Sequence, residues 1–191
     1  MERWSTAFPL ALLAMLAALT LWLDRTVQPP TTPRDGSARH DPDYIVDNLS
    51  AVRLGIDGAP RHRIEAKRML HYPDDDTTHL EAPRYLSYAG KHPQITIVSD
   101  TALLSREGGT VDFNGNVRTV RAATEKQSEL VLTTEHLRVI PDDHFAYTDA
   151  AVNIEDANTK LTAVGLELDD QAKTLKLKSR VRGTYVSPKK K

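Results

Sequence analysis

Apolar and polar residues alternate along most of this chain, which is the pattern of β-strands that bury one face. Segment 110–119 is the clearest example, because Val111, Phe113 and Val117 take odd positions and polar side chains take the even ones. Gly115 lies on the apolar row, where the lack of a side chain admits a close neighbour. We therefore predict a half-buried strand with a close approach at Gly115.

Similar alternation predicts strands on both sides of this segment. Residues 52–56 and 64–72 form the first pair, joined as a hairpin across the turn-forming dipeptide Asp57-Gly58. No comparable helical period appears after the N-terminal segment, so we predict an all-β domain. The later strands are predicted at 94–99, 111–120, 129–140, 147–155, 160–169 and 174–186.

The spacing of these strands indicates an internal repeat of strand, polar turn and strand, in which Val117, Val152 and Val181 take corresponding places. Stacked units of this kind make an elongated two-sheet roll, because each strand turns one apolar face inward. Gly165 lies between two alternating runs and fits a bulge, a close approach of strands or a simple irregularity.

The inward apolar row is the candidate lining of a groove within the roll. Any β-roll needs such residues for its own core, so core packing remains the alternative for each of them. Phe113 and Tyr185 are the bulky members best suited to line a groove mouth. The row comprises Ile64, Ala66, Leu70, Tyr72, Ile95, Ile97, Val111, Phe113, Val117, Leu130, Leu132, Val152, Ile154, Leu166, Leu168, Leu175, Leu177, Val181 and Tyr185.

The N-terminus follows a different pattern, since residues 4–23 contain no charge. A helix of this length spans about 30 Å, the thickness of a bilayer core. Trp4 and Trp22 stand near its ends, where indole rings prefer the membrane interface. The run ends in bulky residues where a signal peptidase prefers small ones, so we predict an uncleaved transmembrane anchor rather than a signal peptide.

The chain is expected to divide into four parts. Residues 1–25 form the anchor, 26–43 a proline-rich tether, 44–187 the β domain and 188–191 a basic tail. Because so few residues precede the anchor, the rest of the protein lies on the other side of the membrane. A short anchor with its N-terminus inside places the β domain outside the cytoplasm.

Composition narrows the possible chemistry. Hydrophobic residues make up 40% and charged residues 27%, with a net charge of -1, which is ordinary for a folded protein and gives no argument for nucleic-acid binding. Cysteine is absent, which excludes disulfides and thiolate metal sites. The run 74–79 lacks the glycine and glutamate of a calcium loop, so a polar turn is favoured over a cation site.

No nucleophile, phosphate-binding or dinucleotide motif is present, and the seven histidines lack the spacing of a helical zinc site. A carbohydrate-active roll would need two acidic groups facing one cleft, whereas the acidic residues here fall mainly in turns and on outward rows. We therefore predict a protein that is not an enzyme and needs neither a cofactor nor a metal.

The anchor, the tether and the strands at 111–117 and 175–185 together resemble the LptC family, bitopic inner-membrane components of the lipopolysaccharide transport bridge. The phrase F-x-G-N-V, at 113–117, is shared by related bridge proteins of the OstA/LptA-like β-jellyroll superfamily, and the anchor selects LptC among them. The resemblance implies an elongated open β-jellyroll after a single transmembrane helix. It also implies a Gram-negative cell, with the helix in the inner membrane and the C-terminal domain in the periplasm.

The resemblance further implies a function. The domain would receive lipopolysaccharide from the inner-membrane ABC transporter, LptF and LptG with the LptB ATPase, and pass it through a hydrophobic groove to LptA, the soluble periplasmic bridge protein. The N-terminal edge of the roll would join the transporter, and the C-terminal edge, at 174–186, would join LptA by strand addition. The alternative is a membrane-tethered structural adaptor that joins envelope proteins by strand addition without binding lipid.

Overall fold

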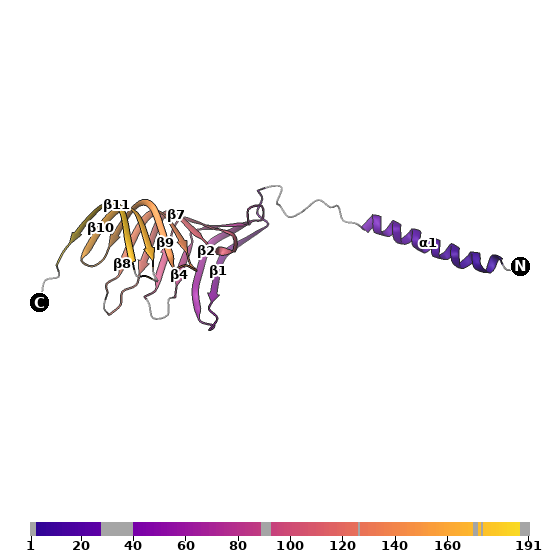
Figure 1. Ribbon diagram of the computed structural model, residues 1–191, viewed down its shortest axis with the longest axis horizontal. Helices are drawn as coiled ribbons and strands as arrows, with labels where there is room; N and C mark the ends of the chain where they lie inside the picture. The colour runs from indigo at the N-terminus through magenta and orange to yellow at the C-terminus, as the bar shows by residue number, and fades with distance from the viewer. Residues whose placement is uncertain are drawn as a thin grey trace. The chain divides into compact units, whose positions relative to one another are not determined.

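The computed structural model describes residues 3–27, 40–88, 93–125, 127–169, 172 and 174–187, and the chain divides into two compact units, 1–34 and 35–191. In the first unit, α1 (Arg3–Val27) is a single helix (Figure 1). Its segment Phe8–Val27 is long and apolar enough to cross a bilayer. The predicted tether 26–43 begins too early, because α1 continues to Val27. The side chain of Trp4, residues 28–39 of that tether and the predicted tail 188–191 lie outside the described residues.

The second unit is an antiparallel β-structure of eleven strands within the described residues (Figure 1). Most of the longer strands overlap the predicted ones, but the predicted strand 52–56 is misplaced, because the strand there runs Tyr44–Leu54 and Ile56 lies in the following turn. Three short strands were not predicted, because four or five residues give little alternation to recognise. The elements are β1 (Tyr44–Leu54), β2 (Pro60–Tyr72), β3 (Thr77–Glu81), β4 (Arg84–Ser87), β5 (Ile95–Val98), β6 (Thr101–Leu104), the 3₁₀ turn η1 (Arg106–Gly108), β7 (Val111–Arg121), β8 (Leu130–Ile140), β9 (Phe145–Glu155), β10 (Thr159–Asp169) and β11 (Thr174–Tyr185).

A single sheet folds over on itself to make the two layers of the roll. The first half of β2 pairs with β4 and its second half with β3, while β7 pairs with β6 through its first half and with β5 through its second. The short strands β3 and β6 therefore fill one layer, and β4 and β5 fill the other. Strands β8 to β11 follow in order, each antiparallel to the one before. In the described part of the chain β1 pairs only with β2 and β11 only with β10, so these two strands form the edges.

Long strands pass from one layer to the other through residues with a positive φ angle. These are Asn48 in β1, Gly115 and Asn116 in β7, Gly165 in β10 and Arg180 in β11, with φ between 48° and 80°. The register of the neighbouring strand shifts at the sites in β7, β10 and β11, as expected for β-bulges. The bends thus use a left-handed conformation that favours glycine and asparagine.

The two glycines singled out in the sequence lie at these bends. A Cβ atom on Gly115 would stand 2.6 Å from Asp100 Oδ2, which confirms the predicted close approach. A Cβ on Gly165 would stand 2.7 Å from Lys178 Cδ, so this glycine combines a bulge with a close neighbour. The predicted hairpin at Asp57-Gly58 is also confirmed, with Gly55 N–H donating to Ala59 O over 2.8 Å.

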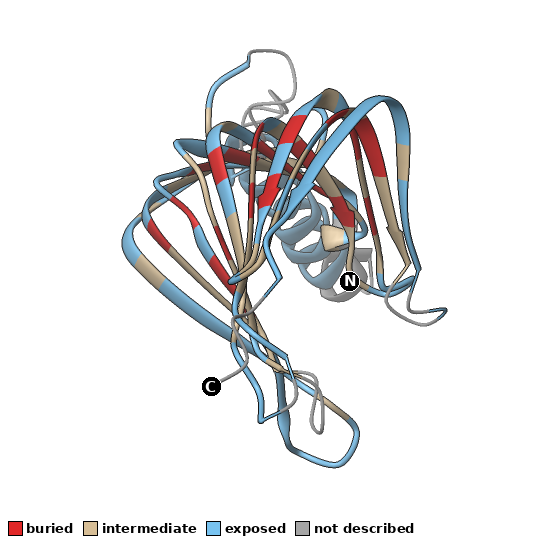
Figure 2. Cartoon of the chain, turned by 90° about the vertical axis from the view of Figure 1, so that its left-hand side faces the viewer, coloured by how far each residue is buried: buried red, intermediate tan, exposed pale blue. Residues whose placement is uncertain are grey.

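Buried side chains line up across the strands. Phe113 lies opposite Ala102 on one side and Leu137 on the other. Ala102 continues the row to Leu80 of β3, and Leu80 to Met69 of β2. Figure 2 shows that buried positions gather near the arch where the strands bend, and that the far ends of the strands are exposed. The apolar core therefore follows the inside of the arch.

The prediction that Leu70 and Tyr72 face inward is wrong. Ala66 is buried as predicted, but the next residue of β2 that packs against the core is Met69, at an odd position. Because strand side chains alternate between faces, Leu70 and Tyr72 point outward. The phase changes where β2 passes from pairing with β4 to pairing with β3, a bend that alternation alone does not reveal.

Candidate functional site

The inner face of the roll is filled in its first half. The core there takes side chains from both layers, and Phe113 at its centre is 0% exposed. The expectation that Phe113 lines a groove mouth is therefore wrong, because the residue packs in the middle of the core. This first cluster consists of Ala66, Leu80, Tyr85, Ile97, Ala102, Val111, Phe113, Val117, Leu137, Val139 and Ala146, with Leu49, Ile64, Met69, Ile95, Leu104 and Leu168 packed against it.

The inner face is only partly covered in its second half. There the last strand carries apolar side chains that nothing in the described chain buries: Leu175 is 42% exposed, Val181 52% and Tyr185 67%. Leu175 continues a row from Ala146 of β9 through Leu168 of β10, whereas Val181 lies in the bulge between Ser179 and Arg182, and Tyr185 lies opposite Thr159 at the start of β10. This second cluster consists of Leu132, Val152, Ile154, Ala163 and Leu166, with Leu130, Leu161, Leu168 and Leu177 packed against it.

The opposite edge also exposes apolar groups. On β1, the side chains of Tyr44, Ile45, Val52 and Leu54 are all exposed. An edge strand also presents unpaired backbone N–H and C=O groups, which can pair with a strand from another chain. Both ends of the roll therefore combine a free backbone edge with apolar side chains, the arrangement used in strand addition.

Polar groups stand at the far rim of the inner face. Arg53 Nη1 lies 3.0 Å from Asp142 Oδ1, which joins the end of β1 to the turn between β8 and β9. His62 Nδ1 lies 2.7 Å from the Tyr85 hydroxyl, and the two rings stack at 5.5 Å. Burial lowers the pKa of His62 and raises the pKa of Tyr85 above its usual range. Both groups are therefore held neutral near pH 7.

A charged network lies on the outer face of the packed half. Arg138 binds the Asp112 carboxylate through two nitrogens, at 2.6 and 3.0 Å, and His136 Nε2 lies 3.2 Å from the same carboxylate. The hydrogen bond to Asp112 is the main cause that raises the pKa of Arg138. Arg138 also donates to the Tyr147 hydroxyl over 3.2 Å. These groups satisfy one another's hydrogen-bonding capacity, which indicates that the network stabilises the structure.

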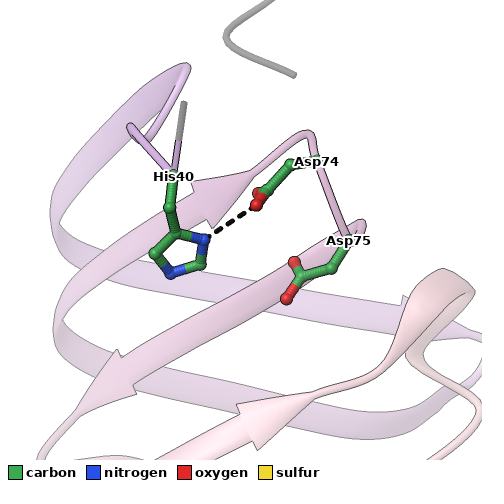
Figure 3. A group of neighbouring side chains, drawn as sticks. All are labelled: His40, Asp74 and Asp75. Atoms are coloured by element: carbon green, nitrogen blue, oxygen red, sulfur yellow. Dashed lines mark hydrogen bonds and ion pairs between the residues drawn. The ribbon is translucent and has the colours of Figure 1, made fainter. Parts of the chain in front are cut away.

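His40, Asp74 and Asp75 form an exposed group at the start of the roll (Figure 3). His40 Nδ1 lies 2.9 Å from Asp74 Oδ2, and the ring stacks on Tyr72 at 4.2 Å. Asp75 Oδ1 already accepts hydrogen bonds from the backbone N–H and the hydroxyl of Thr77. The acidic run thus forms a polar turn that fastens the chain near His40.

A hollow of about 450 Å³ lies over β9, β10 and β11. Val152 and Ala163 belong to the second core cluster, so their neighbours Asn153 and Thr162 point to the outer face of the roll. Sequence reasoning missed this hollow because it considered only inward positions. Its lining comprises Ala151, Val152, Asn153, Thr162, Ala163, Val164, Arg180, Val181 and Arg182.

The inner face brings the predicted lining residues together, apart from Leu70 and Tyr72. Sequence reasoning missed several core members on or beside the short strands, including Leu80, Ala102, Leu137 and Val139. On β8 the buried positions change from even at Leu132 to odd at Leu137 and Val139 where the register with β9 shifts, and alternation alone does not reveal this change.

Comparison with known proteins assigns the family. Among solved structures the fold is similar to that of LptH, the LptA homologous periplasmic component of the conserved lipopolysaccharide transport device from Pseudomonas aeruginosa, with a TM-score of 0.54. The sequence identity is 8%, over 66% of this chain and 95% of that one, so the likeness supports the β-jellyroll fold alone. Curated proteins give no match. A family profile described as lipopolysaccharide assembly, LptC-related, matches residues 10–186, and the chain therefore belongs to the LptC-related family.

Proposed function

We propose that this protein carries lipopolysaccharide from the inner membrane towards the outer membrane by holding its acyl chains against the inner face of the roll. The role in lipopolysaccharide transport follows from the family. The observation that supports the finer proposal is the apolar inner face, which continues from the buried cluster on β9 and β10 to exposed Leu175, Val181 and Tyr185. The sugars and phosphates of the lipid remain in water outside this face.

The partial exposure of this face suits a carrier. Burying acyl chain contributes about 0.8 kcal/mol per methylene, so a dozen fully buried methylenes would contribute on the order of 10 kcal/mol. Binding that strong would trap the lipid. An open face shields only part of each chain and therefore lets the lipid move on. Directional drive would come from ATP hydrolysis by the transporter, and the carrier itself needs no catalytic step.

The two edges are the proposed partner contacts. The β1 edge would pair with the periplasmic domain of the ABC transporter, formed by LptF and LptG with the LptB ATPase, and the β11 edge with LptA. Free backbone groups and exposed apolar side chains at both edges support this assignment. Strand addition at both ends would extend one inner face through successive proteins.

The proposed setting is the inner membrane. Helix α1 would be a single-pass anchor, 28–43 a tether, 44–187 the periplasmic β domain and 188–191 a basic tail. The length and apolar composition of Phe8–Val27 support the anchor, and exposed Trp22 near its end suits a membrane interface. Protease protection in spheroplasts tests the orientation, since only a periplasmic domain is cleaved from outside.

Lipid binding by the full-length protein in neutral detergent tests the carrier role. Val181→Asp and Tyr185→Asp place charge on the inner face and should each weaken lipopolysaccharide binding at least tenfold, a change of about 1.4 kcal/mol. Thr174→Asp is the matched control, because Thr174 lies opposite Asp169 at the other end of the same strand pair, and its neighbour Leu175 takes the inner face. A wild-type protein that joins its partners without binding lipopolysaccharide would support the adaptor instead.

A further inference from the structure

Two arginines beside the hollow over β9 to β11 lack internal partners. Lys160, Lys176 and Lys178 on the same two strands each form an ion pair, with Nζ 3.4, 3.2 and 2.9 Å from a carboxylate oxygen of Glu155, Glu167 and Asp149 respectively. Among the described residues, Arg180 and Arg182 have neither an acidic partner nor a side-chain hydrogen bond. Their positive charge is therefore available to a ligand.

The floor of the hollow supplies further unused polar groups. Asn153 lies opposite Thr162, and Thr162 lies opposite Arg182, so an amide, a hydroxyl and a guanidinium follow one another across three strands. Within the described part of the chain, the side chains of Asn153 and Thr162 form no hydrogen bond. Donors of three kinds thus converge on one concave surface without internal competition.

The backbone at Arg180 takes a left-handed conformation at the bend of β11. Its φ is 52°, a left-handed conformation that favours glycine or asparagine. Arg180 and Val181 form a bulge, since both fit between the paired positions Ser179 and Arg182.

We propose that Arg180, Arg182, Asn153 and Thr162 bind the phosphate groups on the sugar headgroup of the transported lipid. A guanidinium group can donate two parallel hydrogen bonds to the oxygens of one phosphate. The amide of Asn153 and the hydroxyl of Thr162 each add one donor group. The hollow, at about 450 Å³, is larger than one phosphate and of the size of sites for small organic ligands, which suits a phosphorylated sugar. This inference rests on the proposed carrier function and adds to it the headgroup chemistry.

The last strand brings the headgroup site close to the apolar face. Val181 and Arg182 both lie at the hollow, and successive residues of a strand point to opposite faces, so their side chains turn to different sides of β11. Because β11 is an edge, a lipid lying against Leu177 and Val181 can pass its headgroup around that edge. A partner strand on β11 would block this path, so headgroup binding and strand addition compete, and the site holds lipid before it is handed on.

The test measures binding of lipopolysaccharide, intact or enzymatically dephosphorylated, to the full-length protein in neutral detergent. For Arg180→Gln/Arg182→Gln we expect at least a tenfold loss of affinity for the intact lipid and no change for the dephosphorylated one. Lys160→Gln is the matched control, since Lys160 is a cation on the same strand pair that already has a partner. It should change neither affinity. Unchanged thermal unfolding verifies that the double variant folds.

Several results would overturn the proposal. If the wild-type protein binds both lipids equally, the headgroup site is wrong and the carrier function is unaffected. If it binds neither lipid, the carrier function itself is wrong. Equal loss for both lipids in the double variant would assign the arginines to folding or acyl contact. A photoreactive residue at Asn153 that captures an acidic envelope protein and no lipid would make the hollow a protein contact.

Discussion

Arg53 Nη1 lies 3.0 Å from Asp142 Oδ1, so an ion pair joins the end of the first strand to the turn between β8 and β9. Arg53 belongs to the layer of β4, and the turn belongs to the layer of β6. The pair therefore bridges the two layers over the packed half of the roll. Both side chains are exposed, so the pair contributes at most about 1 kcal/mol and can open readily.

Removing this bridge should loosen the rim without unfolding the domain. Asp142→Asn is expected to lower the free energy of unfolding by less than about 1 kcal/mol and to raise amide hydrogen exchange in β1 near Arg53. Asp143→Asn changes the neighbouring acid and is the control, expected to leave exchange in β1 unaltered. If the two variants exchange alike in β1, the ion pair does not hold the layers together.

Among the residues of the inward apolar row, Phe113 should be the one whose replacement by alanine lowers the free energy of unfolding most. Its side chain is fully buried between Ala102 and Leu137, so Phe113→Ala is expected to cost about 3–5 kcal/mol. Tyr185→Ala on the exposed edge should cost far less, while weakening lipid binding. Urea denaturation of the full-length protein measures both, and similar costs for the two variants would contradict the division into a packed and an open half.

Substitution of Gly165 tests how far the bend in β10 depends on glycine. Gly165→Ala meets both a φ of 80° and Lys178 Cδ at 2.7 Å, whereas Gly58→Ala meets a φ of 74° in open space. Each variant should lose about 1–2 kcal/mol of unfolding free energy, because alanine is disfavoured in the left-handed conformation. Gly165→Ala should lose more, because its new Cβ also meets Lys178. Lys178→Ala should recover the additional part in the double variant. A double-mutant cycle in thermal unfolding with no coupling would show that the side chain of Lys178 moves aside freely.

The start of the roll should tighten on mild acidification. Hydrogen bonds that His71 donates to Asp43 and His40 donates to Asp74 are the main causes that raise the pKa values of these two histidines above 6.5. A raised pKa in the folded state gives stability that is fully present below about pH 6.5 and is lost as the pH rises through the folded values. The protection of amides around residues 40–44 against exchange, relative to the base-catalysed intrinsic rate at each pH, should therefore fall as the pH rises from 6 to 8. His71→Gln should remove most of this dependence, and persistence of the full effect would exclude His71 as its source.

Protonation of His62 should lower the stability of the fold, which is opposite to the effect expected for His40 and His71. Burial lowers the pKa of His62 below 6.5, so the stability of its neutral form is present above about pH 6.5 and is lost as the pH falls through the folded value. Acidification should thus loosen the contact between His62 and Tyr85 while it tightens the start of the roll. NMR titration of the two histidines separates these effects, and a raised pKa at His62 would contradict its burial.

Most of the fold was predictable because long strands with one buried face impose a period of two on the sequence. Val111, Phe113 and Val117 show that period, and Gly115 marked the close approach that the structure contains. The short strands were not predictable, since a tertiary pairing rather than a local pattern places Leu80 opposite Ala102. Figure 2 shows why burial could not be read from alternation alone, because burial follows the bend of the roll.

The candidate site was predictable only as a row of apolar positions. Alternation could not tell that β2 changes phase at its bend, so it placed Leu70 and Tyr72 on the wrong face. It also could not distinguish Phe113, which packs in a core made by both layers, from Tyr185, which the last strand leaves exposed. The difference arises from where each strand stands in the sheet order, a property of the whole roll.

The most direct test of the carrier function is photocrosslinking in living cells. A photoreactive residue at Val181 or Tyr185 lies on the exposed part of the inner face, and one at Lys176, opposite Glu167, lies on the outer face of the same strand. We expect lipopolysaccharide adducts from Val181 and Tyr185, dependent on cellular ATP, and none from Lys176. Adducts with protein alone at all three positions would contradict the carrier function and leave a structural adaptor.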